Sequence, residues 1–361
     1  MKKKKQHYIP QFHLRKWSRD GKHIALFNKN NGICVNGVAS IKNMAAKDYL
    51  YGKDDKIENY LGKIEARISP IYDKIITSKS LSALSEEDVA YLLLHITLCN
   101  ERTLGSAERF EDLVKATVKE SIAIKQAHGQ DLDIDTSLID DHVKIVNPCN
   151  MSMNAAFDLF PVISDLKMLL IRNTSNNEFV TSDYPAIKYN LWSNKRNLYS
   201  GWGLSSVGLM FFVPISPQFA ILLYDSGIYK IDKVVNNVII INKKAWIDEV
   251  NKLMLLNANS NIFFSENIPP KYITKLYASV KEHEKNHNSV SVFGNNESKL
   301  IVFSGKRIIY QPKLSHIEIY PGALELPVPR HAQGLLRPES ERIAKEIKEI
   351  QKREENNGNK Y

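Results

Sequence analysis

The spacing of apolar residues predicts that the first half of the chain is mainly helical. One set recurs every three or four positions and would share one helical face: Ile57, Leu61, Ile64 and Ile68. Ser69-Pro70 is expected to restart or kink this helix, because proline removes a backbone donor. Helical spacing returns from Ala107 to Ile124, and the acidic stretch 131–141 reads as a loop or a second short helix start.

A second helix is predicted between these segments, from Ser85 to at least Thr103. Ser85 followed three residues later by Asp88 is close to a capping box, in which each side chain accepts from the other residue's backbone N–H. The core stripe of this helix is expected to comprise Leu92, Ile96 and Cys99.

The second half of the chain reads as short strands. Met168–Ile171 and Phe179–Thr181 flank a turn and have the shape of a hairpin. Short links between further apolar runs favour antiparallel pairing of strands at 209–213, 220–223 and 228–231. A helix capped by Asn242 and carrying Trp246 should follow, then a strand at 262–264 and a last pair at 300–303 and 308–310 around Ser304-Gly305.

These elements predict an α+β protein with a helical first half packed on a mainly antiparallel sheet. We expect one large domain over 1–330, helix-rich at 54–165 and strand-rich at 166–311. Residues 331–361 are predicted to be a charged helical tail, whose helix starts near Pro338 and is supported by pairs such as Glu341 with Lys345. Its narrow apolar stripe would serve either as a packing strut or as a binding surface.

Composition narrows the class of protein. Hydrophobic residues make up 43% of the chain, enough for a sizeable core, but no apolar run approaches the roughly 20 residues of a membrane span. The lysine run 2–5 is followed by polar residues where an export signal needs an apolar segment, so a cytoplasmic location is expected. The three cysteines form no CxxC pair and read as structural thiols.

The net charge of +9 owes four charges to the same lysine run, and it leaves a mildly basic body that could attract phosphates. The segment after this run concentrates chemistry-bearing side chains near the N-terminus: Gln6-His7-Tyr8-Ile9-Pro10-Gln11-Phe12-His13-Leu14-Arg15-Lys16-Trp17-Ser18. We expect it to dock on the body. His7 and His13 could act as general bases or metal ligands, and Arg15 could clamp a phosphate.

Two further places could carry chemistry. Thr181-Ser182-Asp183-Tyr184-Pro185 ends a strand in two hydroxyls and a carboxylate, which suits either a cleft or a turn bonded to nearby amides. On the helix after Ser85, His95 and Arg102 share a face with core residues. Arg102 would therefore form an ion pair, with Asp183 or Glu65, or bind an anion.

The opening segment resembles HYVPQFYLRNFS, the signature of the bacterial family of unknown function DUF4238. The same family carries a TSDxP element like the one at 181–185, and an FPLSP-like stretch similar to 212–217. Asn100–Thr103 resembles its RTP-like helix segment, although Leu104 stands where that segment has proline. The resemblance implies a family without implying a reaction.

The chain lacks GxxxxGK[ST], GxGxxG, GxSxG and HExxH, which argues against the common nucleotide-binding, hydrolase and zincin classes. Our leading hypothesis is a phosphodiester-directed, nuclease-like hydrolase of host-defence or toxin type, acting on RNA or DNA. His7 and Asp183 would be catalytic, and a divalent metal is left open. The residues assigned to substrate binding are Arg15, Arg102, His13 and Ser182.

The alternative hypothesis is a non-enzymatic nucleic-acid or protein binding or sensor module. In this case the same polar residues would form a structural network. A surface for single strands could be built from aromatic and basic residues of the opening segment, or these aromatics could simply close the core: Tyr8, Phe12, Trp17, Lys16 and Arg19.

Overall fold

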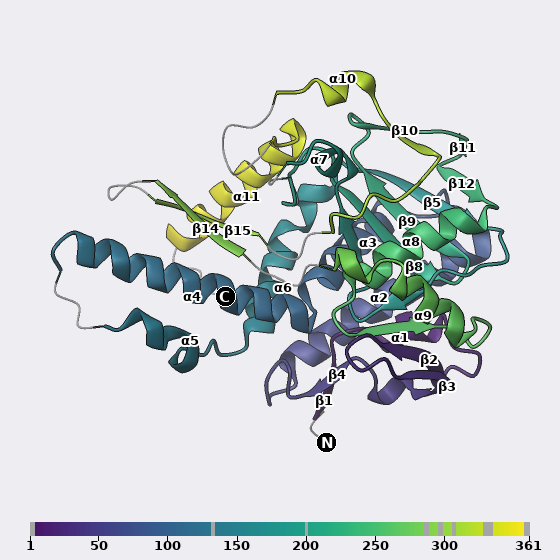
Figure 1. The fold of residues 1–361 in the computed structure, drawn as a ribbon, viewed down its shortest axis with the longest axis horizontal. Helices are drawn as coiled ribbons and strands as arrows, with labels where there is room; N and C mark the ends of the chain where they lie inside the picture. The colour runs from purple at the N-terminus through teal and green to yellow at the C-terminus, as the bar shows by residue number, and fades with distance from the viewer. Residues whose placement is uncertain are drawn as a thin grey trace.

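The structure, a computed structural model, describes residues 4–130, 134–198, 201–284, 289–294, 299–304, 308–327 and 335–356. It confirms the α+β class, with helices in the first half and mostly antiparallel sheets (Figure 1). The described helices are α1 (Gln11–Arg15), α2 (Lys56–Ser78), α3 (Glu86–Glu101), α4 (Leu104–Ala127), α5 (Ile139–His142), α6 (Pro148–Leu159), α7 (Leu191–Lys195), α8 (Lys244–Asn257), α9 (Pro270–Ala278), α10 (Pro321–Leu324) and α11 (Pro338–Asn356).

The largest sheet has six strands in the order β11-β12-β5-β9-β8-β7. Its pairs are antiparallel except for β12 and β5, which run parallel. In sheet order, its strands are β11 (Val234–Val235), β12 (Val238–Ile241), β5 (Lys167–Asn173), β9 (Phe219–Tyr224), β8 (Met210–Ser216) and β7 (Ile187–Tyr189).

A second sheet has four antiparallel strands: β3 (Cys34–Ser40), β2 (His23–Asn28), β13 (Asn261–Phe264) and β6 (Thr181–Ser182). The remaining strands form three separate pairs. These are β1 (Lys5–His7) with β4 (Ala46–Asp48), β10 (Tyr229–Ile231) with β16 (Ile317–Ile319), and β14 (Ser289–Gly294) with β15 (Lys299–Ser304).

Both faces of the six-stranded sheet are covered, because successive side chains of a strand point to opposite faces. Leu170 packs with α2, α3 and α6 on one face. Its neighbours Leu169 and Ile171 pack on the other face with α8 and with the four-stranded sheet. The core is therefore layered as helices, sheet, and then α8 with the second sheet. Figure 1 also shows α4 extending away from this body.

The helical predictions are confirmed where the signal is local. Ser85 and Asp88 form both bonds of a capping box at the start of α3, and Leu92, Ile96 and Cys99 are buried. Helix α2 continues through Pro70, so it does not restart there, and the kink that was the alternative stays a prediction. Helix α3 ends at Glu101, two residues before Thr103, which instead caps α4 by accepting from the Ser106 N–H.

Several strand pairings differ from the sequence prediction. The hairpin expected at 168–181 does not form, since β5 belongs to the six-stranded sheet and β6 pairs with β13. Strands β8 and β9 pair as expected, whereas β10 pairs with β16.

Segment 308–310 forms no strand, and β15 pairs with β14. The expected turn residue Gly305 lies outside the described residues. Helix α8 has Lys243 at its N-cap, so Asn242 does not cap it.

The helix predicted from Pro338 is present as α11, which packs on α6 and on the short 3-10 turn Phe160–Ile163. Arg337 fixes its start by a bidentate pair with Asp165 and by donating to the carbonyls of Val162, Leu204 and Ser206. Ser340 also donates to Val162 O at 2.8 Å. These contacts favour the packing strut, and the division into a domain and a tail stays a prediction.

Candidate functional site

The N-terminal segment docks on the body, as its composition predicted. Strand β1 pairs with β4, and α1 follows directly. Tyr8 and Trp17 are buried in an apolar cluster with Ile9 and Leu14, and Trp17 donates its indole N–H to Phe179 O at 2.7 Å. The rings of Tyr8 and Trp17 therefore close the core, one of the two alternatives weighed for these aromatics.

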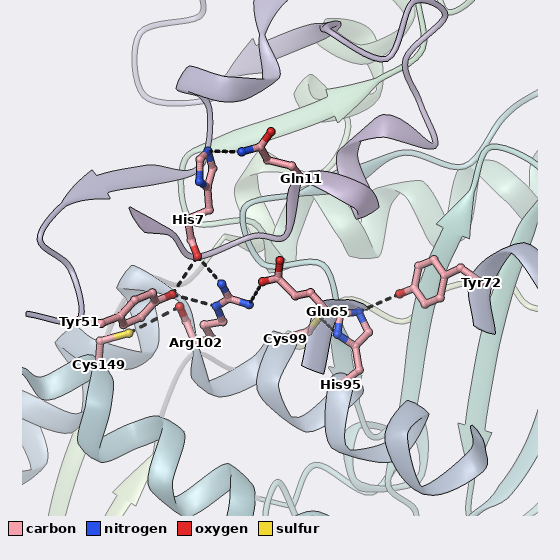
Figure 2. Close-up of polar contacts among 9 residues, drawn as sticks. All are labelled: His7, Gln11, Tyr51, Glu65, Tyr72, His95, Cys99, Arg102 and Cys149. Atoms are coloured by element: carbon pink, nitrogen blue, oxygen red, sulfur yellow. Dashed lines mark hydrogen bonds and ion pairs between the residues drawn. The ribbon is translucent and has the colours of Figure 1, made fainter. Parts of the chain in front are cut away.

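Arg102 joins this segment to the helical layer (Figure 2). Its guanidinium donates to Glu65 Oε1 at 2.6 Å, to the Tyr51 hydroxyl at 2.8 Å and to His7 O at 2.6 Å. The Tyr51 hydroxyl also donates to His7 O at 2.9 Å. Arg102 is only 3% exposed. Of the partners expected for Arg102, Glu65 is the one that it contacts. Each of the three guanidinium nitrogens donates to one acceptor within the fold.

The His7 side chain points away from the guanidinium and toward Gln11, as Figure 2 shows. Its Nε2 lies 3.1 Å from Lys42 O and 3.4 Å from Gln11 Nε2. Burial lowers the pKa of His7, against the opposing effect of the Lys42 carbonyl. Arg15 is exposed and donates to Gln11 Oε1 at 3.0 Å. His7 and Arg15 thus meet at Gln11, at the surface of the segment.

His13 is fully buried between Trp17 and the strand end at 181. Its Nε2 lies 2.8 Å from Thr181 Oγ1, and its ring centroid lies 5.1 Å from that of Trp17. Nδ1 has no hydrogen-bond partner. Burial lowers the pKa of His13 to about 3, assisted by the charge of Lys16. His13 is therefore neutral at pH 7 and ties the segment to β6.

This burial predicts acid sensitivity. Between the ordinary histidine pKa of 6.5 and about 3, the unfolded state binds a proton at His13 that the folded state does not. Stability is therefore lost as pH falls through this window, by up to about 1.4 kcal/mol per pH unit. Urea unfolding should show wild type losing about 2 kcal/mol more than His13→Gln between pH 7 and pH 5. Equal losses would contradict the buried neutral imidazole.

The remaining polar groups near Arg102 are also enclosed. His95 Nε2 lies 3.0 Å from the Tyr72 hydroxyl and 3.5 Å from Cys99 Sγ. Cys149 Sγ lies 3.6 Å from Arg102 O. Burial raises the pKa of both Cys99 and Cys149 to about 12, which keeps these thiols protonated and unreactive. Their environment agrees with the interpretation as structural thiols.

Asp183 fixes the loop that leads into β13. Its two carboxylate oxygens accept from the backbone N–H groups of Asn259, Ser260 and Asn261, each at 2.8 Å. Burial raises the pKa of Asp183, and these three donors act in the opposite direction. The Ser182 hydroxyl accepts from the Tyr184 N–H at 3.0 Å. The strand end is thus a turn bonded to nearby amides, the alternative weighed for this motif.

The loop held by Asp183 forms one wall of a cavity of about 390 Å³, which we call the Arg109 cavity. Helix α4 contributes Gly105, Glu108 and Arg109 to it, and α3 contributes Asn100. The other lining residues are Asn30, Tyr184, Lys188, Asn257, Asn259 and Ser260. This volume lies in the range of small-ligand sites, about 300–1,000 Å³.

Two cationic side chains face this cavity. The Arg109 guanidinium carbon lies 5.4 Å from the Tyr184 ring centroid, and Arg109 Nη2 forms an ion pair with Glu101 Oε2 at 3.7 Å. Lys188 lies on the edge strand β7 between Ile187 and Tyr189, which point into the core. Burial, and then the charge of Arg109, lower the pKa of Lys188 to about 8.

The cavity also holds polar groups with unused bonding capacity. Asn100 is 1% exposed, and neither polar atom of its carboxamide has a hydrogen-bond partner. A buried amide without partners is costly, so this one is suited to a ligand that enters the cavity. Burial and the charge of Asp112 raise the pKa of Glu108. A carboxyl and an amine whose pKa values both move toward neutrality are typical of reaction sites.

The six site residues predicted from sequence do not line this cavity. His7 and Arg15 meet at Gln11, Arg102 joins Glu65, and His13 and Ser182 lie along β6. Asp183 comes nearest, because it holds the backbone of Asn259 and Ser260 in the cavity wall. The motif at 181–185 therefore lies beside the cavity, although Tyr184, and not Asp183 or Ser182, lines it. The catalytic roles given to His7 and Asp183 stay predictions.

No motif in the sequence indicated four residues that line the cavity: Arg109, Lys188, Asn100 and Glu108. The signal available for Lys188 was a lone cation between two apolar residues of a strand. Among the described side chains, no group of three or more His, Cys, Asp or Glu is arranged to hold a metal ion. The described part of the chain also contains no helix with both the length and the apolar character that a membrane crossing needs.

A protein-family model matches most of the chain. The model of a family described as "Protein of unknown function (DUF4238)" matches residues 5–267. This region contains the N-terminal segment, the Arg102 network and every residue that lines the Arg109 cavity. No curated protein and no solved structure matches the chain.

Proposed function

The chain belongs to the DUF4238 family, and since that family carries no reaction with it, we propose a function from the chain's own geometry: a phosphodiester-directed hydrolase that acts on RNA or DNA. The observation that supports this proposal is the Arg109 cavity. It combines a guanidinium, an amine with a lowered pKa and a carboxyl with a raised pKa. A guanidinium suits phosphate oxygens because its N–H groups form a planar fork.

Hydrolysis of a phosphodiester needs an attacking water to lose a proton and the leaving oxygen to gain one. Lys188 in its neutral form can accept the proton, and Glu108 in its protonated form can donate one. In this proposal Arg109 binds the phosphate, and Asp183 acts as a positioning residue for the cavity wall. The competing assignment is the pair predicted from sequence, with His7 and Asp183 as acid and base.

A non-enzymatic binding or sensor module is the second candidate. Its support is that Arg102 and Asp183 are both 3% exposed and use their polar atoms within the fold. In such a module the Arg109 cavity would bind its ligand without a reaction. A host-defence or toxin-type role and a cytoplasmic location remain part of the leading proposal.

The test is cleavage of labelled RNA and DNA by purified protein, with and without magnesium or manganese. Arg109→Gln and Lys188→Met should lower cleavage at least about 100-fold, the usual contribution of positioned acid, base or charge. The exposed residues Arg67 and Lys63 offer matched controls, Arg67→Gln and Lys63→Met. If only His7→Gln and Asp183→Asn lose cleavage activity, the catalytic pair is the one predicted from sequence. Binding without cleavage would favour the module.

A further inference from the structure

The charges of the Arg109 cavity carry information about its ligand. Lys188 Nζ has no carboxylate within ion-pair distance among the described residues, although the side chain is largely buried. Arg109 has Glu101 at 3.7 Å, and that carboxylate also accepts from Ser152 at 2.7 Å. Burying a cation without a close partner is costly, so a bound anion would relieve Lys188, whereas Arg109 already has Glu101 as a partner.

The number of cations favours a ligand with two negative charges. A phosphate monoester carries about −1.5 to −2 charges at pH 7, whereas an internal phosphodiester carries one. Arg109 and Lys188 therefore match a monoester better than a diester when the Glu108 carboxyl on the cavity wall is protonated. The cavity also borders the first turns of α4, where backbone N–H groups and the helix dipole favour an anion.

Asn100 adds an independent observation. Its carboxamide is buried at the end of α3, lines the cavity and uses neither its donor nor its acceptor within the protein. A cavity meant only for a free anion would gain nothing from an unsatisfied acceptor. A ligand with a donor and an acceptor next to its phosphate, such as a sugar or a base, would satisfy both atoms.

We propose that the Arg109 cavity binds a terminal phosphate monoester attached to a polar group of nucleotide size, with Arg109 and Lys188 on the phosphate and Asn100 on the attached group. This inference rests on the proposed phosphate-directed function and names the terminal group that the cavity recognises, with Lys188 in its charged form and not as the neutral base of the hydrolysis. The monoester can belong to a free nucleotide or to the phosphorylated end of a strand, since both present the same chemistry.

The test is isothermal titration calorimetry on the full chain, in EDTA so that metal-dependent cleavage does not interfere. The probes are AMP, adenosine, citrate, and one oligonucleotide with either a 5′-phosphate or a 5′-hydroxyl. AMP should bind, and adenosine should bind at least about tenfold more weakly. Arg109→Gln and Lys188→Met should each weaken AMP binding at least about tenfold, whereas Arg67→Gln and Lys63→Met should leave it unchanged. Thermal unfolding of each variant checks that it is folded.

Two further readouts separate a specific site from general charge attraction. At pH 8.5 wild type should take up a proton when AMP binds, because the phosphate returns Lys188 to its charged form. The measured enthalpy should then depend on the buffer, and this dependence should disappear in Lys188→Met. With inorganic phosphate as a further probe, Asn100→Leu should weaken the binding of AMP more than the binding of inorganic phosphate, whereas equal weakening would overturn the role of Asn100.

The remaining outcomes decide between sources or reject the inference. Tighter binding of AMP assigns the site to free nucleotides, and tighter binding of the 5′-phosphorylated strand assigns it to strand ends. Equal binding of the 5′-hydroxyl strand, of adenosine or of citrate would overturn the monoester site. A protein that cleaves strands but ignores every monoester keeps the proposed function and loses this inference. A protein that binds AMP but cleaves nothing keeps this inference and loses the proposed function.

Discussion

Replacing Arg102 with methionine should destabilise the fold by about 3–5 kcal/mol, the cost of removing one partner from a buried ion pair. The substitution leaves Glu65 without its cation and leaves His7 O and the Tyr51 hydroxyl without their shared donor. It also removes the hydrogen bond from the residue after α3 to the N-terminal segment. Urea unfolding at pH 7, followed by circular dichroism, measures the loss as a lower midpoint with an unchanged slope.

Two variants make this result specific to Arg102. Arg102→Lys keeps the charge but offers a single ammonium to three acceptors, so we expect an intermediate loss. Arg67→Met removes an exposed arginine from α2 and should change stability by less than about 0.5 kcal/mol. A near-neutral Arg102→Met, combined with weaker nucleic-acid binding, would instead support the anion-binding role that the sequence left open.

Lys188→Met should stabilise the protein at pH 7, by up to about 3 kcal/mol, while removing its phosphate binding. The pKa of Lys188 is about 8 in the fold and about 10.5 when exposed. Below pH 8 the amine is charged in both states, and the fold bears the full cost of burying that charge. As pH rises from 8 to 10.5, the folded state loses the proton first, so wild-type stability rises and the advantage of methionine shrinks.

This pH dependence is what distinguishes a functional lysine from a structural one. Residues kept for function often lower stability, and their removal then raises it. Urea unfolding at pH 7 and at pH 10 should show a large gain for Lys188→Met at the lower pH and a small one at the higher. Lys63→Met, on the exposed face of α2, should show neither. A loss of stability in Lys188→Met at pH 7 would make Lys188 a structural residue.

The parts of the fold that sequence analysis predicted correctly depend on neighbouring residues. The Ser85 capping box and the stripe with Leu92 and Ile96 are determined within a few turns of one helix. Strand pairing is different, because a strand can choose partners from any part of the chain. The hairpin expected at 168–181 failed for this reason: β5 pairs with β9 and β12, and β6 pairs with the distant β13.

The same distinction applies to the candidate site. The motif at 181–185 was found because its hydroxyls and carboxylate end an apolar strand, and it does lead to the cavity wall through Tyr184 and Asp183. Arg109 and Lys188 carry no local signal, since one lies among the charges of α4 and the other is a single lysine in β7. Their convergence depends on how α4 packs against the edge of the sheet, which no spacing in the sequence encodes.

We propose that this protein recognises phosphate in the Arg109 cavity and not at the N-terminal segment. The most direct measurement is single-turnover cleavage of a labelled strand by Arg109→Gln beside Arg15→Gln, with wild type as the reference. Arg15 was a candidate for phosphate binding from the sequence, whereas Arg109 is the arginine that lines the cavity. We expect Arg109→Gln to be at least about 100-fold slower, with its unfolding transition unchanged, and Arg15→Gln to match wild type. Full cleavage activity in Arg109→Gln, with loss of cleavage in Arg15→Gln, would contradict phosphate recognition in the Arg109 cavity.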